Sequence, residues 1–364
     1  MMNYNSKNER IKKAYFEYLK DAKGRKDRTI DNKRKAIDRF ELYTKYDDFR
    51  KFNKEKARAF KRYLESFKSK QTDKPISKST YVSTLLNLKD FFLWLRFQKG
   101  YKKIDKNHIE YFNPLEGDFN MARSKKAKEF PTLEQIKAVL ASMPNDSEIQ
   151  RRDRALIAFT ALTAMRDGAI ASLKLKHIHL ESCLVEQLSD EVNTKFSKTI
   201  YTYFFPVGDD IKQIVIDWIR FLREVKLFGD NDPMFPRTKI THDENFELKP
   251  GGLEPIHWQS ANQIRKIFKK AFKSAGLPNY TPHSFRNTLT NLGLKICNIP
   301  EDFKAWSQNL GHNDPLMTFT SYGNIETHRQ GEIILGLKGD KNHPSKDKML
   351  EEIYWEIKKS KKSD

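Results

Sequence analysis

The segment 281-TPHSFRNTLTNLG-293 combines a helix start with two basic side chains one turn apart. Proline is favoured in the first turn of a helix, because the N–H that it lacks would have no partner there. His283 and Arg286 are three residues apart, so they share one face of the helix that begins after Pro282. The segment therefore predicts a helix over 283–296 that presents an imidazole and a guanidinium side by side.

Helical periodicity also runs through the first hundred residues. Apolar residues recur at helical spacing in four segments, near 11–19, 28–44, 53–64 and 78–98. Asn53 is a favourable N-cap for the third helix, and Gly100 is a stop signal after the fourth. Residues 1–112 are therefore predicted to form a small helical domain.

Residues 113–131 have the composition of a linker. They have proline at both ends, a glycine, the pair Lys125 and Lys126, and no periodicity. Directly after them, Thr132 and Gln135 match a capping box, which predicts that a helix and a second domain begin here. This domain is predicted to span 132–330, followed by a tail over 331–364 with a short helix near 348–358.

The second domain is predicted to combine helices with a small sheet. Helical patterns recur at 150–166, 209–226, 259–275 and 283–296. Residues 183–207 are instead rich in Val, Thr, Tyr, Phe and Ile and end at Pro206, which is typical of strands and a hairpin. The predicted fold class is mainly α with a small antiparallel β-sheet.

Charge is distributed unevenly along the 364 residues. The formal net charge is +20, and residues 1–130 hold 35 basic and 18 acidic residues, whereas 131–364 hold 33 and 30. A basic front half indicates a polyanionic partner, nucleic acid first, although a basic surface that only serves solubility is the alternative. The two cysteines, Cys183 and Cys297, form no CxxC pair and indicate neither a zinc site nor a disulfide framework.

Three more segments carry residues suited to phosphate chemistry. In 160-TALTAMRDGAIASLKLKHIHL-180, Arg166 ends a buried apolar helix, and in 192-VNTKFSKTIYTYFFPV-207, Lys195 and Lys198 lie in a β-rich turn. In 310-LGHNDPLMTFTSYG-323, His312 comes ten residues before Tyr322. Each segment alone has an ordinary structural explanation, so the prediction depends on all four occurring in order.

The ordered set resembles the tyrosine recombinase, or phage integrase, family. That family has an Arg after a buried helix, a Lys in a β-hairpin, a His-x-x-Arg box, a Leu-Gly-His box and a Tyr nine or ten residues on. The resemblance covers about 130–325 by motif. The N-terminal helices resemble the family's core-binding domain by architecture, and the resemblance implies a C-shaped clamp around duplex DNA.

The resemblance implies a role for each motif residue. Tyr322 would attack a DNA phosphodiester, and a phenol with a pKa near ~10 needs a strongly positive surrounding to do so. Arg166 and Arg286 would grip the non-bridging oxygens bidentately, because guanidinium stays charged at any working pH. His283 would add to the positive surrounding, and His312 would hydrogen-bond the phosphate.

The leaving 5′ oxygen needs a proton, which a lysine on a hairpin can give. The resemblance implies Lys195 for this role. Lys198 is the alternative, since its distance from Pro206 is the more family-like.

The sequence departs from the family pattern at one position near the first arginine. The family commonly has an acidic residue three positions after that arginine, where this chain has Ala169. Asp167 is the candidate substitute, although its side chain would leave the helix in another direction. Asn287 also stands where a second histidine often follows the box arginine.

No cofactor or metal is expected. The chain has no GxxxxGK[ST] loop and no DxD or HExxH cluster. Double-stranded DNA is the expected partner, contacted by basic residues of the linker and of helix 259–275. These are Lys125, Lys126, Arg265, Lys266, Lys269 and Lys270.

The resemblance further implies a homotetramer on DNA, and a directionality factor is a candidate partner. The N-terminus has no apolar signal core and no run approaches the roughly 18 apolar residues of a membrane span, so a cytoplasmic, nucleoid-associated protein with no membrane partner is expected. Two rival functions stay open: a type IB topoisomerase-like enzyme, and a catalytically silent DNA-binding protein on the same fold.

Overall fold

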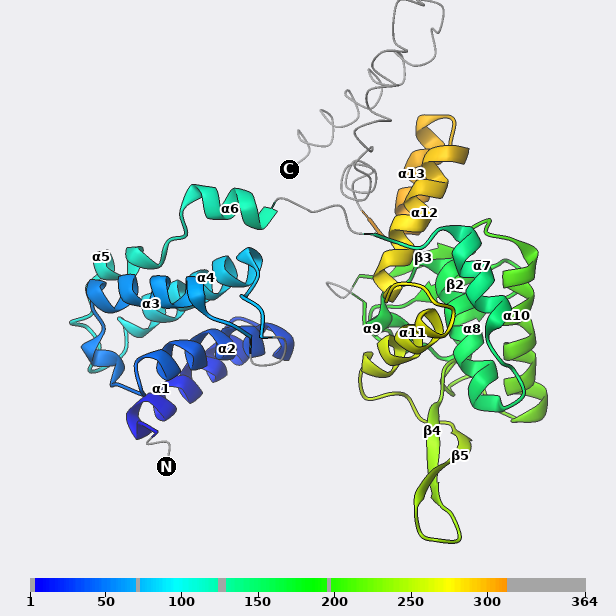
Figure 1. The fold of residues 1–364 in the computed structure, drawn as a ribbon, viewed down its shortest axis with the longest axis horizontal. Coiled ribbons are helices and arrows are strands. Elements are labelled where there is room, and N and C mark those ends of the chain that lie inside the picture. Colours follow the sequence, from blue (N-terminus) through cyan, green and yellow to red (C-terminus); the bar gives the residue numbers. More distant parts are fainter. Residues whose placement is uncertain (1–3, 70–72, 124–128, 195–197, 313–364) are drawn as a thin grey trace, which may run out of the picture. The chain divides into compact units, whose positions relative to one another are not determined.

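The computed structural model describes residues 4–69, 73–123, 129–194 and 198–312. Contacts divide the chain into two compact units, Met1–Lys126 and Ala127–Asp364. Both units are mainly helical, and the second also contains short antiparallel strands (Figure 1). The predicted fold class, mainly α with a small antiparallel sheet, is confirmed.

The first unit is built from helices, as its periodicity predicted. Its α-helices are α1 (Ser6–Glu17), α2 (Asp27–Tyr43), α3 (Lys54–Ser66), α4 (Lys78–Leu95), α5 (Lys106–Ile109) and α6 (Glu116–Arg123). Three single turns join them: a π turn at Tyr18–Ala22 and 3₁₀ turns at Phe49–Lys51 and Glu110–Phe112. Asn53 caps α3 by accepting the N–H of Lys56 at 2.9 Å, as the sequence indicated.

The core of the first unit is aromatic. Phe92 of α4 stacks on Phe52 with ring centroids 4.1 Å apart, and Phe40 of α2 meets Phe92 edge to face. A buried ion pair lies beside this core, where Lys12 Nζ donates to Glu41 Oε2 at 2.6 Å. Carboxylate and ammonium thus neutralise each other inside the unit.

The sequence wrongly predicted an irregular linker throughout 113–131. Glu116–Arg123 forms α6, and Phe119 packs against the aromatic core of the first unit. Lys78 Nζ also binds Asp118 Oδ1 at 2.7 Å, which ties α6 to the start of α4. With only eight residues and a glycine in its first turn, α6 is too short for a clear periodic pattern.

Helices also dominate the second unit. They are α7 (Leu133–Ser142), α8 (Glu148–Thr163), α9 (Asp167–Ile170), α10 (Asp209–Arg220), α11 (Asn262–Ser274), α12 (Pro282–Ile296) and α13 (Pro300–Asn309). A 3₁₀ turn at Leu175–His177 and a π turn at Phe221–Val225 complete them. The predicted capping box of Thr132 and Gln135 is confirmed at the start of α7.

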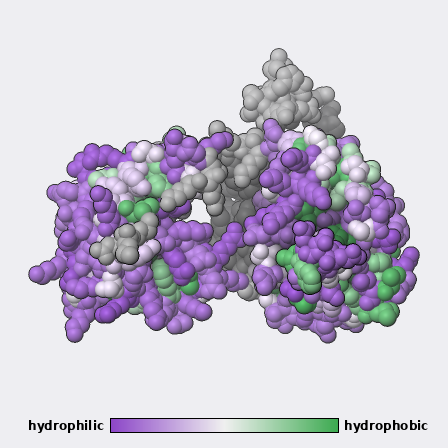
Figure 2. Space-filling view, turned by 60° about the horizontal axis from the view of Figure 1, so that its bottom comes forward, coloured by the Kyte–Doolittle hydropathy of each residue, from purple (hydrophilic) through white to green (hydrophobic). Residues whose placement is uncertain are grey.

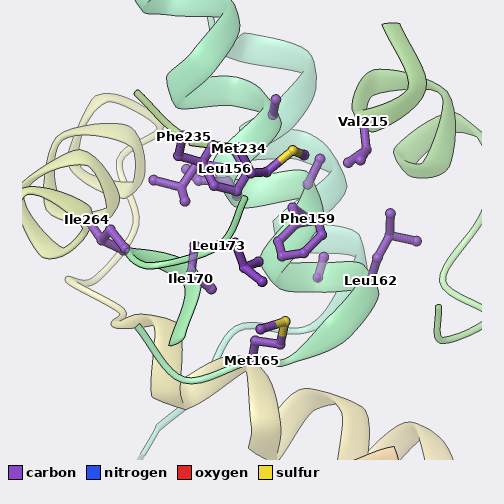
Figure 3. Packing of buried hydrophobic residues seen from close by; sticks show 14 of the residues in the cluster. Leu156, Phe159, Leu162, Met165, Ile170, Leu173, Val215, Met234, Phe235 and Ile264 are labelled. Atoms are coloured by element: carbon purple, nitrogen blue, oxygen red, sulfur yellow. The ribbon is translucent and has the colours of Figure 1, made fainter. Parts of the chain in front are cut away.

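The second core surrounds α8. Leu156, Phe159 and Leu162 of this helix are buried, and Figure 3 shows them among side chains from the following turn, from α10 and from α11. Because residues 155–163 of α8 are all buried, its C-terminal end occupies a fixed place in the unit. Arg166 follows that end by three residues.

Two small sheets complete the second unit. Strands β1 (Ile178–His179), β2 (Leu184–Gln187) and β3 (Ile200–Tyr203) form an antiparallel sheet in that order. Strands β2 and β3 lie within the predicted region 183–207, and β1 lies before it. Strands β4 (Arg237–His242) and β5 (Leu248–Glu254) form a separate hairpin that the sequence did not predict. Figure 1 shows this hairpin extending from the body of the unit.

On the face in Figure 2, the described surface is mostly hydrophilic with scattered apolar areas. Among the described helices, none is long and apolar enough to cross a membrane. Cys183 and Cys297 are both free thiols and partly buried.

Candidate active site

Arg286 is the buried centre of the predicted site. It lies one turn into α12 and is only 2% exposed. Its Nη1 donates to the carbonyl of Ala164 at 2.8 Å, and its Nη2 donates to the carbonyl of Leu310. One guanidinium therefore joins the end of α8, the start of α12 and the end of α13.

His312 completes this cluster. Its Nε2 lies 2.8 Å from Arg286 Nη2, and only 7% of the residue is exposed. Because a guanidinium can only donate hydrogen bonds, Nε2 is the acceptor in this contact. His312 is thus held directly beside a permanent positive charge.

Ala164 explains how the first arginine segment reaches the cluster. This residue ends α8 in the left-handed conformation, with φ +46°, and its N–H bonds the carbonyl of Thr160 at 2.8 Å. The turn aims the Ala164 carbonyl at Arg286 and reverses the chain. Arg166 follows two residues later as the half-buried N-cap residue of α9.

His283 lies at the start of α12, in the turn before Arg286. It is exposed, whereas Arg286 is buried, because the helix begins at the surface and runs into the core. Thr288, further along α12, donates its hydroxyl to the carbonyl of Pro131 and so anchors the helix to the start of the unit. The helix therefore presents His283 outward from a fixed base.

The loop between β2 and β3 carries the candidate lysines. Lys198 is exposed directly before β3, while Lys195 lies outside the described residues. Upstream, the N–H of Asn193 donates to Ser172 Oγ at 2.8 Å, and the Ser172 hydroxyl donates to the carbonyl of Ala169 at 3.0 Å. The loop is thereby attached to the turn that follows Arg166.

Glu191 provides a second anchor for this loop. Its carboxylate lies 2.8 Å from Lys174 Nζ and 2.8 Å from Lys176 Nζ. Hydrogen bonds from these two ammonium groups lower the pKa of the Glu191 carboxyl to about 2. The carboxylate is therefore charged at neutral pH and fixes the base of the loop.

Comparison with known proteins gives the chain a family. The model of the phage integrase family matches residues 129–329, more than half of the chain and the whole region just described. The chain belongs to the phage integrase family. The resemblance drawn from the four sequence segments is confirmed.

Relatives and solved structures agree with this membership. Tyrosine recombinase XerC of Lactobacillus leichmannii is 25% identical over 245 residues, which cover 67% of this chain and 71% of that protein. A lambda integrase (75–356) dimer bound to a COC′ core site aligns with a TM-score of 0.58 at 16% identity, over 92% of this chain and 99% of that one. XerH bound to its difH substrate aligns with a TM-score of 0.51 at 18% identity, over 84% and 78%. At these identities the solved structures show a shared fold.

A carboxylate directly follows the first arginine. Asp167, the candidate substitute for the missing acidic residue, pairs with Arg265 of α11. Its Oδ2 lies 2.6 Å from Arg265 Nη2, and its Oδ1 accepts the N–H of Gly168 at 2.9 Å. A part for Asp167 in orienting Arg166 stays a prediction from the sequence.

The basic residues predicted on helix 259–275 lie on α11. Lys266, Lys269 and Lys270 are exposed there, and Arg265 is exposed but ion-paired. Lys125, Lys126, Lys195 and Tyr322 lie outside the described residues. Their roles stay predictions from the sequence.

Proposed function

We propose that this chain is a site-specific DNA recombinase that cleaves and rejoins strands through a 3′-phosphotyrosine link to Tyr322. The observation that carries the proposal is the Arg286 guanidinium, which binds both Ala164 and His312. It unites the Arg166, His-x-x-Arg and Leu-Gly-His segments around one buried positive charge. Tyr322 follows His312 by ten residues.

The two arginines are proposed to bind the scissile phosphate. A phosphodiester gains negative charge towards its transition state, and fixed guanidinium donors stabilise that charge without reorganising. The carbonyl contacts of Arg286 hold its plane in place before DNA arrives. Arg166 starts α9 two residues beyond one of these carbonyls, so both cations share one rigid support.

The cleavage step conserves atoms and charge. The Tyr322 hydroxyl releases its proton to solvent and its oxygen attacks phosphorus. The bond from phosphorus to the 5′ oxygen breaks, and a tyrosyl ester forms on the 3′ side. The leaving 5′ oxygen takes a proton from the ammonium group of Lys195, with Lys198 as the alternative donor. A free 5′ hydroxyl results, and its attack on the ester reverses the step.

Rejoining is proposed to need neither ATP nor a metal ion. The tyrosyl ester keeps the free energy of the broken phosphodiester bond, so a 5′ hydroxyl can displace the tyrosine directly. The arginines supply the positive charge that a metal ion supplies in other phosphoryl-transfer sites.

Double-stranded DNA is the proposed partner. Among the solved structures of similar fold, the lambda integrase is bound to a COC′ core site and XerH to its difH substrate. We assign 1–112 to DNA binding, 113–131 to a connection that includes α6, 132–330 to catalysis and 331–364 to a tail. A homotetramer would exchange two pairs of strands at paired sites, in the cytoplasm and on the nucleoid. A directionality factor is a candidate regulator.

Covalent capture tests this function. DNA ends attached to the protein in cells are mapped first, and a duplex with that site and a nick beside it is then incubated with the protein and denatured. We expect a covalent adduct with the natural chain and none with Tyr322→Phe, which should still bind. Adduct with Tyr322→Phe would contradict the nucleophile assignment, and no adduct with either would favour a silent DNA-binding protein. Relaxation of plasmids lacking the mapped site would favour the topoisomerase-like alternative.

A further inference from the structure

One side-chain amide joins the end of α13 to the edge of the three-stranded sheet. Asn309 Oδ1 accepts the N–H of Tyr203 at 2.6 Å, and Asn309 Nδ2 donates to the Tyr203 carbonyl at 2.9 Å. The next N–H along β3, that of Phe204, bonds Cys183 on the β2 side at 2.8 Å. The Tyr203 groups therefore point away from β2, and Asn309 occupies the place where another strand would pair.

The attachment of β3 to the end of α13, here called the junction, is strengthened by two further contacts. The hydroxyl of Thr202 donates to the Asn309 carbonyl at 3.2 Å. The rings of Phe205 and Trp306 lie 4.6 Å apart. Together these contacts join the C-terminal half of β3 to the last turn of α13.

Gly311 allows the close approach at the other end of the junction. It has φ +71°, and a Cβ added there would lie 2.9 Å from Ile200 Cδ1. A side chain at this position would crowd the Ile200 side chain of β3, and the positive φ itself favours glycine. Gly311 thus allows the segment that leads to His312 to lie against the start of β3.

The junction connects two parts of the proposed chemistry. The start of β3 comes two residues after Lys198 and five after Lys195, so the strand sets where the lysine loop ends. Asn309 is three residues before His312, whose ring contacts Arg286. We infer that Asn309 is a positioning residue that holds the lysine-bearing hairpin in register with the Arg286–His312 cluster. This inference rests on the proposed function.

An asparagine suits this task because its amide offers both a donor and an acceptor. An aspartate would keep the acceptor for the Tyr203 N–H but lose the donor for its carbonyl. An alanine would keep neither. Water can then solvate the half-buried edge of β3, so loss of the amide should loosen the register of the strand rather than unfold the unit.

The test compares two leaving groups in the same variant. The substrate is the duplex mapped by covalent capture, with oxygen or sulfur as the bridging 5′ atom. A thiol with a pKa near ~8.5 leaves as thiolate without a proton donor, whereas the oxygen needs one. Asn309→Ala should cleave the oxygen substrate about 10- to 100-fold more slowly than the natural chain, from misplacement of the donor. On the sulfur substrate it should cleave at close to the natural rate.

Both substrates are cleaved by the same preparation of the variant. The ratio of the two cleavage rates therefore does not depend on the fraction of the protein that is folded. Asn298→Ala is a matched control, since its amide donates to the Ile296 carbonyl at 3.0 Å just before α13 starts. It should leave both rates unchanged. An Asn309→Ala defect that is equal on both substrates, or no defect at all, would overturn the inference. Absence of a Tyr322-dependent adduct with the natural chain would instead overturn the proposed function.

Discussion

Among the described residues of the second unit, two arginines are buried, in regions of opposite character. Arg152 of α8 is 1% exposed at the base of the β4–β5 hairpin, and Arg286 of α12 is 2% exposed near the end of α8. Arg152 Nη2 binds the Asp153 carboxylate at 2.7 Å, and its guanidinium lies 5.3 Å from the centre of the Trp258 ring. The hydrogen bonds of Arg286 described above join it to two carbonyls and the His312 imidazole.

The difference separates a cation paired with a carboxylate from one held by backbone carbonyls, for which we propose a role in catalysis. The carboxylate beside Arg152 neutralises its charge, so this arginine connects α8 to the hairpin through Pro236 and Thr238. The two carbonyls that Arg286 binds fix the direction of its guanidinium and carry no formal charge themselves. An anion bound there, such as the proposed phosphate, would meet a donor that is already oriented.

The largest expected effect is on catalysis at Arg286. Arg286→Lys keeps the positive charge but loses the planar fork that binds two carbonyls and a phosphate. We expect the single-turnover rate of adduct formation to fall about 10²- to 10³-fold, with DNA affinity changed only a few fold. Arg166→Lys should give a loss of the same order. Adduct formation at the natural rate in both variants would contradict the proposed role of these two arginines in the reaction.

Arg152→Lys is the matched substitution at the structural site. It should lower the free energy of unfolding by about 1–3 kcal/mol, because the hydrogen bonds to the hairpin are lost. Denaturant unfolding measures this free energy. The fraction of active, folded protein is measured separately, as the amount of covalent adduct formed in the first turnover. The rate of adduct formation per folded molecule should equal that of the natural chain. A rate defect comparable to that of Arg286→Lys would show that both arginines serve the reaction.

Exposed cations on α11 should act on DNA affinity alone. Lys266→Ala should weaken binding and reduce the salt slope of log Kd against log salt by about 0.9, the value for one lost phosphate contact. Arg265→Ala should change the slope less, because Asp167 already offsets the Arg265 charge. Binding titrations between about 50 and 200 mM salt measure both slopes. Equal slopes for the two variants would mean that DNA displaces the Asp167 ion pair.

The smallest expected effect is at Glu191, a carboxylate that is neither buried nor fully exposed. Glu191→Gln removes its pairing with Lys174 and Lys176 and should lower Tm by no more than about 4 °C at neutral pH. Since the folded pKa is depressed to about 2, the stabilisation is complete above the ordinary carboxyl pKa and is lost as the pH falls towards 2. Melting curves of both proteins should therefore converge with acidification. A difference that grows at low pH would contradict this account.

Much of the fold could be predicted because its signals are local. Caps such as Asn53 and Thr132, together with apolar spacing, fix helix starts within a few residues of their place. The β4–β5 hairpin was missed because Pro250 and the two glycines after it interrupt the strand pattern of β5, and a bulge interrupts the pairing. Helix α6 was missed because its eight residues are too few to show a clear helical spacing of apolar residues.

The candidate site was predictable in its residue types but not in its contacts. The order and spacing of the sequence motifs identified His283, Arg286 and His312 as candidate site residues. The partners of Arg286 are backbone carbonyls, which any sequence has, and one depends on the left-handed turn at Ala164. Asp167 and Arg265 are 98 residues apart, so no local pattern links them. Such contacts arise from tertiary packing and appear only in the folded chain.

The most direct test of the whole account locates the amino acid that carries the DNA. The trapped adduct is digested with nuclease and protease, and the nucleotide-bearing peptide is sequenced by mass spectrometry. We expect one modified residue, Tyr322, with the nucleotide attached through its 3′ phosphate. Attachment at another residue, or through a 5′ phosphate, would contradict it.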